Sequence, residues 1–181
     1  MRDAGSQLWL TSAITNDDVA KALTLCFSLK KRLSSRKIGV IVSKEVSSSF
    51  RKALRHGFDF VFNLEEDEKP TNLRMEEFVK LYGLTLKSFQ KVVYLKPSMI
   101  VIKNSDEIFD IHKKSGFTWG EGGALSVLLM KPSLETFRIL MKDLETRNGN
   151  GNTYSQFITL KIRKNVRIFI FIYVSVIFNK S

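Results

Sequence analysis

The chain has 181 residues, of which 44% are apolar and 26% charged, and this composition is typical of one globular domain rather than of a disordered or fibrous chain. Its formal net charge is +11, but no recognition motif accompanies the basic surplus, so we expect no nucleic acid partner. The single cysteine, Cys26, excludes an internal disulfide. Because no apolar leader follows Met1, we expect a reducing, cytoplasmic location.

Short apolar runs alternate with helical patterns as far as residue 147, and such alternation predicts an α/β fold with a mostly parallel sheet between helices. The predicted strands are 8–14, 37–42, 59–63, 91–95, 98–102 and 125–130. The predicted helices are 16–33, 47–55, 75–89 and 132–147, with a capped helical turn at 105–110. Pro132 is expected at the first position of the last helix.

The first helix carries apolar side chains at helical spacing, which predicts its inward face: Val19, Leu23, Cys26, Phe27 and Leu33. On this face Cys26 is expected to be a core residue and not a nucleophile. His56 and His112 have no acid or cysteine at ligand spacing, so we expect both on the surface.

The last segment, residues 161–181, differs from the rest of the chain in composition. It holds five basic residues and no acid, and its run Ile168–Phe178 has eleven residues, too few to cross a bilayer as a helix. Because this run does not alternate, we expect it to lie free and to drive association. Deleting residues 165–181 is then expected to improve solubility.

Four collinear stretches resemble glycogenin and its relatives in glycosyltransferase family 8: "TNDDVAKALTLCFSLKK", "SRKIGVIVSKEVSSSFRKAL", "KVVYL…MIVIKNSDEIFD" and "VLLMKPSLETF". The resemblance covers about Leu8 to Ile158. It implies a Rossmann-like nucleotide-sugar domain of the GT-A type over residues 7–160, followed by a tail at 161–181 without a clear match. The family transfers glucose from UDP-glucose with Mn²⁺, first to a tyrosine of the protein itself and then to the growing chain.

The turn after the strand 91–95 departs from the family pattern. In the family this strand leads into an Asp-x-Asp motif, whose carboxylates bind the Mn²⁺ that holds the UDP diphosphate. Here Lys96, Pro97 and Ser98 occupy the motif. An ammonium group has no lone pair, and a lone serine hydroxyl is a weak ligand for a hard cation. We therefore expect no bound metal and impaired catalysis, with the turn either an ordinary strand end or a cationic replacement for the metal.

The resemblance also assigns the other positions of the family site. The nucleotide side corresponds to Thr15 and Asn16, to Val19 in place of a tyrosine, and to Lys80, which could equally be an ordinary surface lysine. The sugar side corresponds to Ala124, Leu125 and Ser126 in place of Asn-Ser-Gly, and to Asn152, Ser155 and Gln156, where Gln156 alone is retained. Further family ligands lie beyond the point where this chain ends.

Three functions remain open at this stage. The chain could be an active glucosyltransferase, or a non-catalytic family member that binds an active glycogenin-like partner. It could also be a truncated gene product, which the unmatched tail favours. We expect a UDP-sugar to bind weakly. The chain could also form a homo-oligomer or a hetero-oligomer with a glycogenin-like protein. These residues do not identify the acceptor.

Overall fold

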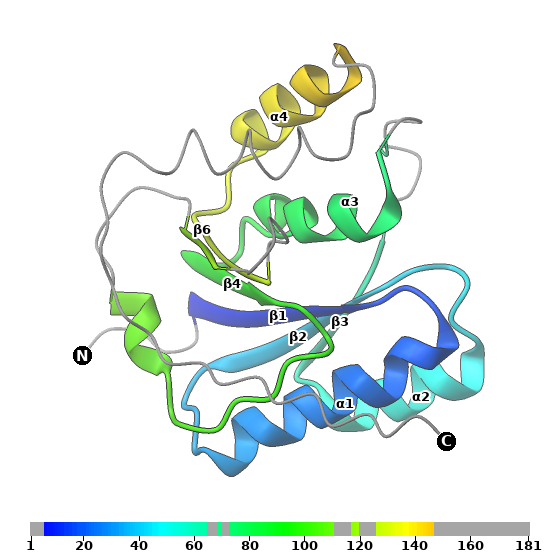
Figure 1. Cartoon of the computed structure of the whole chain (residues 1–181), viewed down its shortest axis with the longest axis vertical. Coiled ribbons are helices and arrows are strands. Elements are labelled where there is room, and N and C mark those ends of the chain that lie inside the picture. Colours follow the sequence, from blue (N-terminus) through cyan, green and yellow to red (C-terminus); the bar gives the residue numbers. More distant parts are fainter. Residues whose placement is uncertain (1–5, 65–68, 70–72, 111–116, 120–125, 147–181) are drawn as a thin grey trace.

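A computed structural model describes residues 6–64, 69, 73–110, 117–119 and 126–146 (Figure 1). Its strands are β1 (Gln7–Ala13), β2 (Lys37–Val42), β3 (Phe60–Asn63), β4 (Lys91–Leu95), β5 (Phe117–Trp119) and β6 (Val127–Met130). Its helices are α1 (Asn16–Lys31), α2 (Ser48–Gly57), α3 (Met75–Tyr82) and α4 (Leu134–Thr146), with the 3₁₀ turns η3 (Gly83–Thr85) and η4 (Asp106–Asp110).

The strands form one mixed sheet in the order β3-β2-β1-β4-β6-β5. The first four strands in this order are parallel to one another, while β6 runs antiparallel to β4 and β5 antiparallel to β6. The predicted α/β class with a mostly parallel sheet is therefore confirmed. Because β1 and β4 are parallel neighbours, the loops that follow them leave the sheet at the same edge.

Helices cover both faces of the sheet, with α1 and α2 on one side and α3, η3 and α4 on the other (Figure 1). Successive side chains of a strand point to opposite faces, so β4 contributes Val93 and Leu95 to the α1 layer and Val92 and Tyr94 to the α3 layer. All seven residues of β1 are buried, as expected of a central strand that is covered on both sides.

The inward face of α1 was predicted only in part. Val19 and Cys26 are buried as expected, together with Leu29, but Phe27 remains 59% exposed. Leu33 is 84% exposed and lies beyond the end of the helix, at a backbone φ of 55°. Spacing along a helix identifies an apolar stripe but not the angle at which the helix packs on the sheet. In this structure that angle leaves the Phe27 side chain exposed to solvent.

Residues 98–102 do not form the predicted strand. Met99 and Val101 are buried in the α1 layer and Ile100 and Ile102 are exposed, so the alternation is real. However, β4 is already paired with β1 and β6, and the Val101 N–H donates instead to the Ser28 hydroxyl at 3.0 Å. The segment is an extended chain that crosses α1.

Two predicted helix boundaries were also wrong, and one short strand was not predicted. The helix expected over 75–89 ends at Tyr82 and tightens into η3, where Gly83 packs closely on the sheet and an added Cβ would lie 2.5 Å from the flexible end of Met130 and 3.0 Å from Leu10 Cδ2. The last helix begins at Leu134, after the cap Ser133, and not at Pro132. β5 was not predicted, because three residues are too few to show a period.

Candidate functional site: the turn after β4 and its neighbours

Lys96 begins a tight turn at the carboxyl end of β4. The Met99 N–H donates to the Lys96 carbonyl at 3.0 Å, which closes a four-residue turn with Pro97 in its second position. Proline favours this position because its ring already holds the φ that the turn requires. The expectation of a strand-ending turn is confirmed, and the Lys96 side chain is exposed there.

The carboxyl ends of β1 and β4 are locked together by side chains. The Thr11 hydroxyl donates to the Leu95 carbonyl at 2.8 Å, and the Ser12 and Tyr94 hydroxyls lie 2.9 Å apart. Burial raises the pKa of Tyr94, and its hydrogen bond to Ser12 offsets this only in part, so the phenol stays neutral. These bonds fix the turn at Lys96 beside the β1–α1 loop.

Thr15 and Asn16, assigned to the nucleotide side, form the start of α1. The Asp18 carboxylate accepts the N–H groups of Thr15 and Ile14, each at 3.2 Å, and forms an ion pair with Lys21 at 3.1 Å. Partial burial opposes ionisation of Asp18, but these hydrogen bonds outweigh it, so its pKa lies below the usual value. The Asp18 charge is therefore already engaged within the loop.

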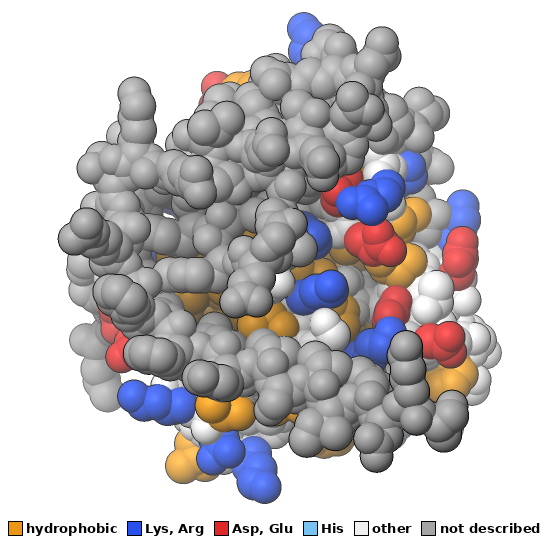
Figure 2. Space-filling model, viewed as in Figure 1, with side chains coloured by type: hydrophobic (Ala, Val, Ile, Leu, Met, Phe, Trp, Pro, Cys, Tyr) orange, Lys and Arg blue, Asp and Glu red, His pale blue; other side chains and the backbone are white. Residues whose placement is uncertain are grey.

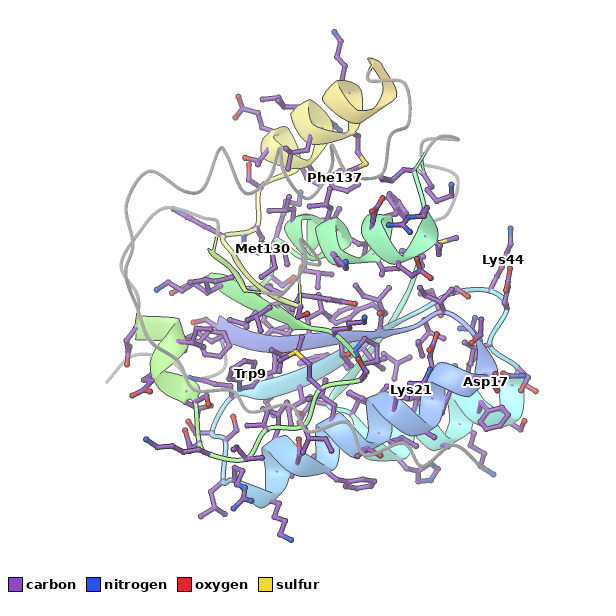
Figure 3. The ribbon with its side chains drawn as sticks, in the orientation of Figure 1. Trp9, Asp17, Lys21, Lys44, Met130 and Phe137 are labelled. Carbon is purple, nitrogen blue, oxygen red and sulfur yellow. The ribbon has the colours of Figure 1, made fainter. Side chains whose placement is uncertain are left out.

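The Asn16 side chain has a structural partner. Its amide oxygen accepts the Ser47 N–H at 2.9 Å and so joins the start of α1 to the start of α2. Val19, at the family's tyrosine position, is 1% exposed and packs in the core. This position offers neither a ring to stack on nor a hydroxyl to bind a ribose. Figure 3 shows Asp17 and Lys21 on the first turns of α1, at the opposite end of β1 from Trp9.

Lys80 lies in the last turn of α3 and is half-buried. Burial lowers the pKa of its ammonium, Glu77 acts in the opposite direction, and the positive charge of Lys96 lowers the pKa further. Lys80 is thus neither fully exposed nor fully buried, and its assignment to the nucleotide side stays a prediction.

One residue of the expected sugar side lies within the described part of the chain. The Lys96 N–H donates to the Ser126 carbonyl at 2.9 Å, so the turn contacts the residue before β6. The other expected positions lie outside the described residues: Ala124, Leu125, Asn152, Ser155 and Gln156. His112 and the tail 161–181 also lie outside them, whereas His56 is exposed, as predicted.

The described residues do not fit a divalent metal. No group of three or more His, Cys, Asp or Glu side chains that could hold an ion occurs among them. At the turn itself the two motif positions supply an ammonium and a hydroxyl. An ammonium group has no lone pair to offer a cation, and the loss of the family metal site stays a prediction.

Sequence reasoning missed Arg51, which supports the neighbouring loop after β2. Its guanidinium donates to the Val46 carbonyl and the Asn63 amide oxygen at 2.8 and 2.9 Å, and also to the Ser43 carbonyl. An arginine four residues into a short helix gives no local signal of this role, because its acceptors lie on two other segments, the loop after β2 and the end of β3.

Solved structures with this fold are glycosyltransferases. The bifunctional glycosyltransferase WbbM aligns over 88% of this chain and 37% of its own, with a TM-score of 0.67 and 11% identity. GlyE of Streptococcus pneumoniae aligns over 88% of this chain and 44% of its own, with a TM-score of 0.60 and 18% identity. The galactosyltransferase LgtC gives a TM-score of 0.56 over 83% of this chain and 70% of its own. The chain has the GT-A glycosyltransferase fold.

Sequence similarity narrows this class to a family. Glycogenin-1 of Caenorhabditis elegans is 35% identical over 161 residues, which are 80% of this chain and 36% of that protein. Glycogenin-1 of Oryctolagus cuniculus is 30% identical over 70% of this chain and 42% of its own length. No family model matches. The chain is a glycogenin-like protein of glycosyltransferase family 8.

The match is confined to part of each relative. The chain spans between about a third and a half of the length of the glycogenin-1 proteins that it matches. Among the described residues, none of the helices is both long and apolar enough to cross a membrane.

Proposed function

We propose that the chain is a glycogenin-like glycosyltransferase domain whose Mn²⁺-dependent transfer of glucose from UDP-glucose is impaired. The turn at Lys96–Met99 carries this proposal, because it places an ammonium and a hydroxyl where the family has two carboxylates. A divalent ion in such a site neutralises the diphosphate as it leaves. Without carboxylates this turn has no means of holding that ion.

The described elements around this turn are well formed. β1 and β4 are paired in parallel and joined through Thr11 and Ser12, and the start of α1 is capped by Asp18. This contrast supports a second proposed role, in which the domain binds an active glycogenin-like partner without catalysing transfer. In both roles a UDP-sugar binds weakly at most and without Mn²⁺.

Calorimetry with UDP-glucose, in the presence of MnCl₂ and in the presence of EDTA, tests the first proposal. We expect Mn²⁺ to leave the affinity of the natural chain unchanged. The double variant Lys96→Asp, Ser98→Asp should gain Mn²⁺-dependent binding, because it restores two oxygen ligands at the end of β4. Turnover should not return, since Asn152 and Ser155 remain in place of acids.

Lys52→Asp provides a matched control, because it introduces a carboxylate on an exposed position of α2 outside the site. It should not create Mn²⁺-dependent binding. A micromolar, Mn²⁺-dependent affinity of the natural chain for UDP-glucose would refute the proposal.

A further inference from the structure

Helix α1 ends in a hydrogen-bonded cap that has a leucine where glycine is usual. The Leu33 N–H donates to the Lys30 carbonyl at 3.0 Å and the Ser34 N–H donates to the Leu29 carbonyl at 3.3 Å, which together form a Schellman motif. Its central residue takes a left-handed backbone, and glycine suits this position because it has no Cβ. Leu33 adopts it at a φ of 55°, with its side chain 84% exposed. The leucine therefore strains the backbone without being buried.

Leu33 is not needed to close this cap either. A Schellman motif is often closed by an apolar contact of the residue that follows the left-handed one. Here that residue is Ser34, whose hydroxyl donates to Asp106 at 2.6 Å. A strained and exposed side chain that the fold does not require is a candidate for binding.

Hydrogen bonds join the chain after β4 to the end of α1. The Val101 N–H donates to the Ser28 hydroxyl at 3.0 Å, and the Asn104 side-chain amide donates to the carbonyls of Arg32 and Leu33 at 3.0 and 3.1 Å. The chain between these two anchors therefore runs alongside the last turn of α1 (Figure 1).

Together the two elements expose a ridge of apolar side chains. On the chain after β4, the alternation that buries Val101 turns its two neighbours outward, and on α1 the residue before the Ser28 anchor is exposed as well. Single exposed apolar residues are common, but these are joined at one end of one helix by the two anchors. The apolar ridge consists of Phe27, Leu33, Ile100 and Ile102.

Unpaired cations border the apolar ridge. Lys31, Arg32 and Lys103 are exposed, and within the described part of the chain their side chains form no hydrogen bond or ion pair. Of the nearest acids in η4, Asp106 is engaged by Ser34 and Ser35, and Glu107 is exposed. Figure 2 shows hydrophobic side chains beside Lys and Arg side chains at the lower edge of the view, where α1 ends. This edge therefore attracts anions.

We propose that the apolar ridge and its bordering cations dock on a membrane surface that carries anionic lipids. Apolar side chains enter the boundary between headgroups and acyl chains, while Lys and Arg meet the anionic headgroups. A stable protein interface engages about 20–30 residues from each partner, which is far more than this edge offers. A fluid lipid surface needs no matching pocket for a protruding leucine. This inference does not depend on the proposed glucosyltransferase function.

Co-sedimentation of the full chain with vesicles tests the proposal. The chain should bind vesicles of phosphatidylcholine that contain about one third phosphatidylserine, and should bind pure phosphatidylcholine at least tenfold more weakly. Raising the NaCl concentration should weaken binding to the anionic vesicles, because salt screens the contact with their headgroups.

Leu33→Gly separates binding from folding. Glycine removes the apolar side chain and relieves the left-handed backbone, so the melting temperature should stay the same or rise while vesicle affinity falls about fivefold. Ile102→Ser should weaken binding similarly. Ile139→Ser is the matched control, because Ile139 is equally exposed but lies on α4, on the other face of the sheet.

A second pair of variants tests the cations at constant net charge. Lys31→Gln with Lys103→Gln should weaken binding to anionic vesicles about tenfold. Lys52→Gln with Lys131→Gln removes the same charge from exposed positions outside this edge and should leave affinity nearly unchanged. Every variant retains the basic residues of 161–181, so a difference between the two doubles comes from the end of α1.

The possible outcomes decide the proposal. Absence of vesicle binding, equal binding to neutral and anionic vesicles, or equal losses in the two lysine doubles would overturn it. So would an affinity that Leu33→Gly leaves unchanged. If sedimentation velocity instead shows an oligomer that Leu33→Gly dissociates, without vesicle binding, the ridge contacts a second copy and the membrane proposal is wrong. Anionic binding that Leu33→Gly weakens without loss of stability supports it.

Discussion

The two ends of the parallel sheet treat their polar groups in opposite ways. At the amino end, Asp106 in η4 accepts hydrogen bonds from the Trp9 indole, from the Ser34 hydroxyl, and from both the N–H and the hydroxyl of Ser35, at 2.6 to 3.2 Å. At the carboxyl end, hydrogen bonds from Thr11, Ser12 and Asp18 also join the elements, but Lys80 is half-buried there and forms no hydrogen bond or ion pair within the described part of the chain, although the charges of Glu77 and Glu76 act on it. The two ends therefore differ in whether their buried charge has a direct partner.

This difference has consequences for stability. A satisfied network of hydrogen bonds rigidifies the region that it joins, here the loop before β2, the start of β1 and η4. A half-buried charge without a direct partner costs stability instead. We therefore expect loss of the Asp106 carboxylate to lower the free energy of unfolding and loss of the Lys80 charge to raise it slightly.

The largest effect is expected for Asp106→Ala. It leaves the Ser35 N–H without its acceptor and the Trp9 indole with only the Ser34 hydroxyl at 3.0 Å, and hydrogen bonds to a charged group contribute about 1.5–3 kcal/mol each. The free energy of unfolding should fall by about 2–3 kcal/mol in urea titrations. Glu107→Ala, at an exposed position of the same turn, is the control and should change stability by less than about 0.5 kcal/mol.

The Asp106 network also predicts a dependence of stability on pH. Partial burial opposes ionisation, but the hydrogen bonds from Ser34, Ser35 and Trp9 outweigh it and hold the Asp106 pKa below the usual value. A carboxylate with a lowered folded-state pKa stabilises the fold above its unfolded-state pKa and loses this contribution as pH falls through the folded-state pKa. The stability difference between the natural chain and Asp106→Ala should therefore shrink as pH falls below about 4. A difference that grows on acidification would contradict the assignment.

A smaller effect of opposite sign is expected for Lys80→Met. Burial and the Lys96 charge lower the Lys80 pKa, with Glu77 and Glu76 raising it and Arg74 lowering it. The charged form is thus disfavoured in the fold at neutral pH, and the variant should be more stable by about 0.5 kcal/mol without ligand.

The cost of charge at Lys80 is relieved as pH rises through its lowered pKa towards the unfolded value. Thermal melts should therefore show the advantage of Lys80→Met narrowing above pH 9 or so, near the ordinary lysine range. Lys52→Met should show no such trend. Equal stability of Lys80→Met and the natural chain at all pH values would show that water already solvates this ammonium fully.

The smallest effect is expected for Lys21→Ala at the start of α1. Its ion pair with Asp18 is largely exposed, and such pairs contribute about 0.2–1 kcal/mol. Asp18 keeps its bonds from Ile14 and Thr15, so the helix cap survives and the loss of stability should stay below about 0.5 kcal/mol. A loss above 1 kcal/mol in urea titrations would mean that the cap depends on the ion pair.

The sequence by itself determined features that depend on near neighbours in the chain. Five of the six predicted strands are present, because a strand's apolar run is a local pattern, and the helical start at Asn16 follows from the polar residues that precede the apolar stripe. The replacement of the Asp-x-Asp motif by Lys96 and Ser98 is likewise readable without a structure, since it depends on residue type at one turn. The other positions of the candidate site were assigned from the resemblance to glycogenins.

Tertiary structure decided the features that depend on distant partners. Residues 98–102 have the alternation of a strand, but both edges of β4 are already paired, with β1 and with β6. The Val101 N–H therefore donates to the Ser28 hydroxyl on α1 instead of to a strand. Phe27 lies on a predicted inward face and remains exposed, because docking angle is set by the whole α1 layer. Ser35 and Asp106 are 71 positions apart, and only the tertiary fold joins them, since no periodic pattern records which residues of separate elements will meet.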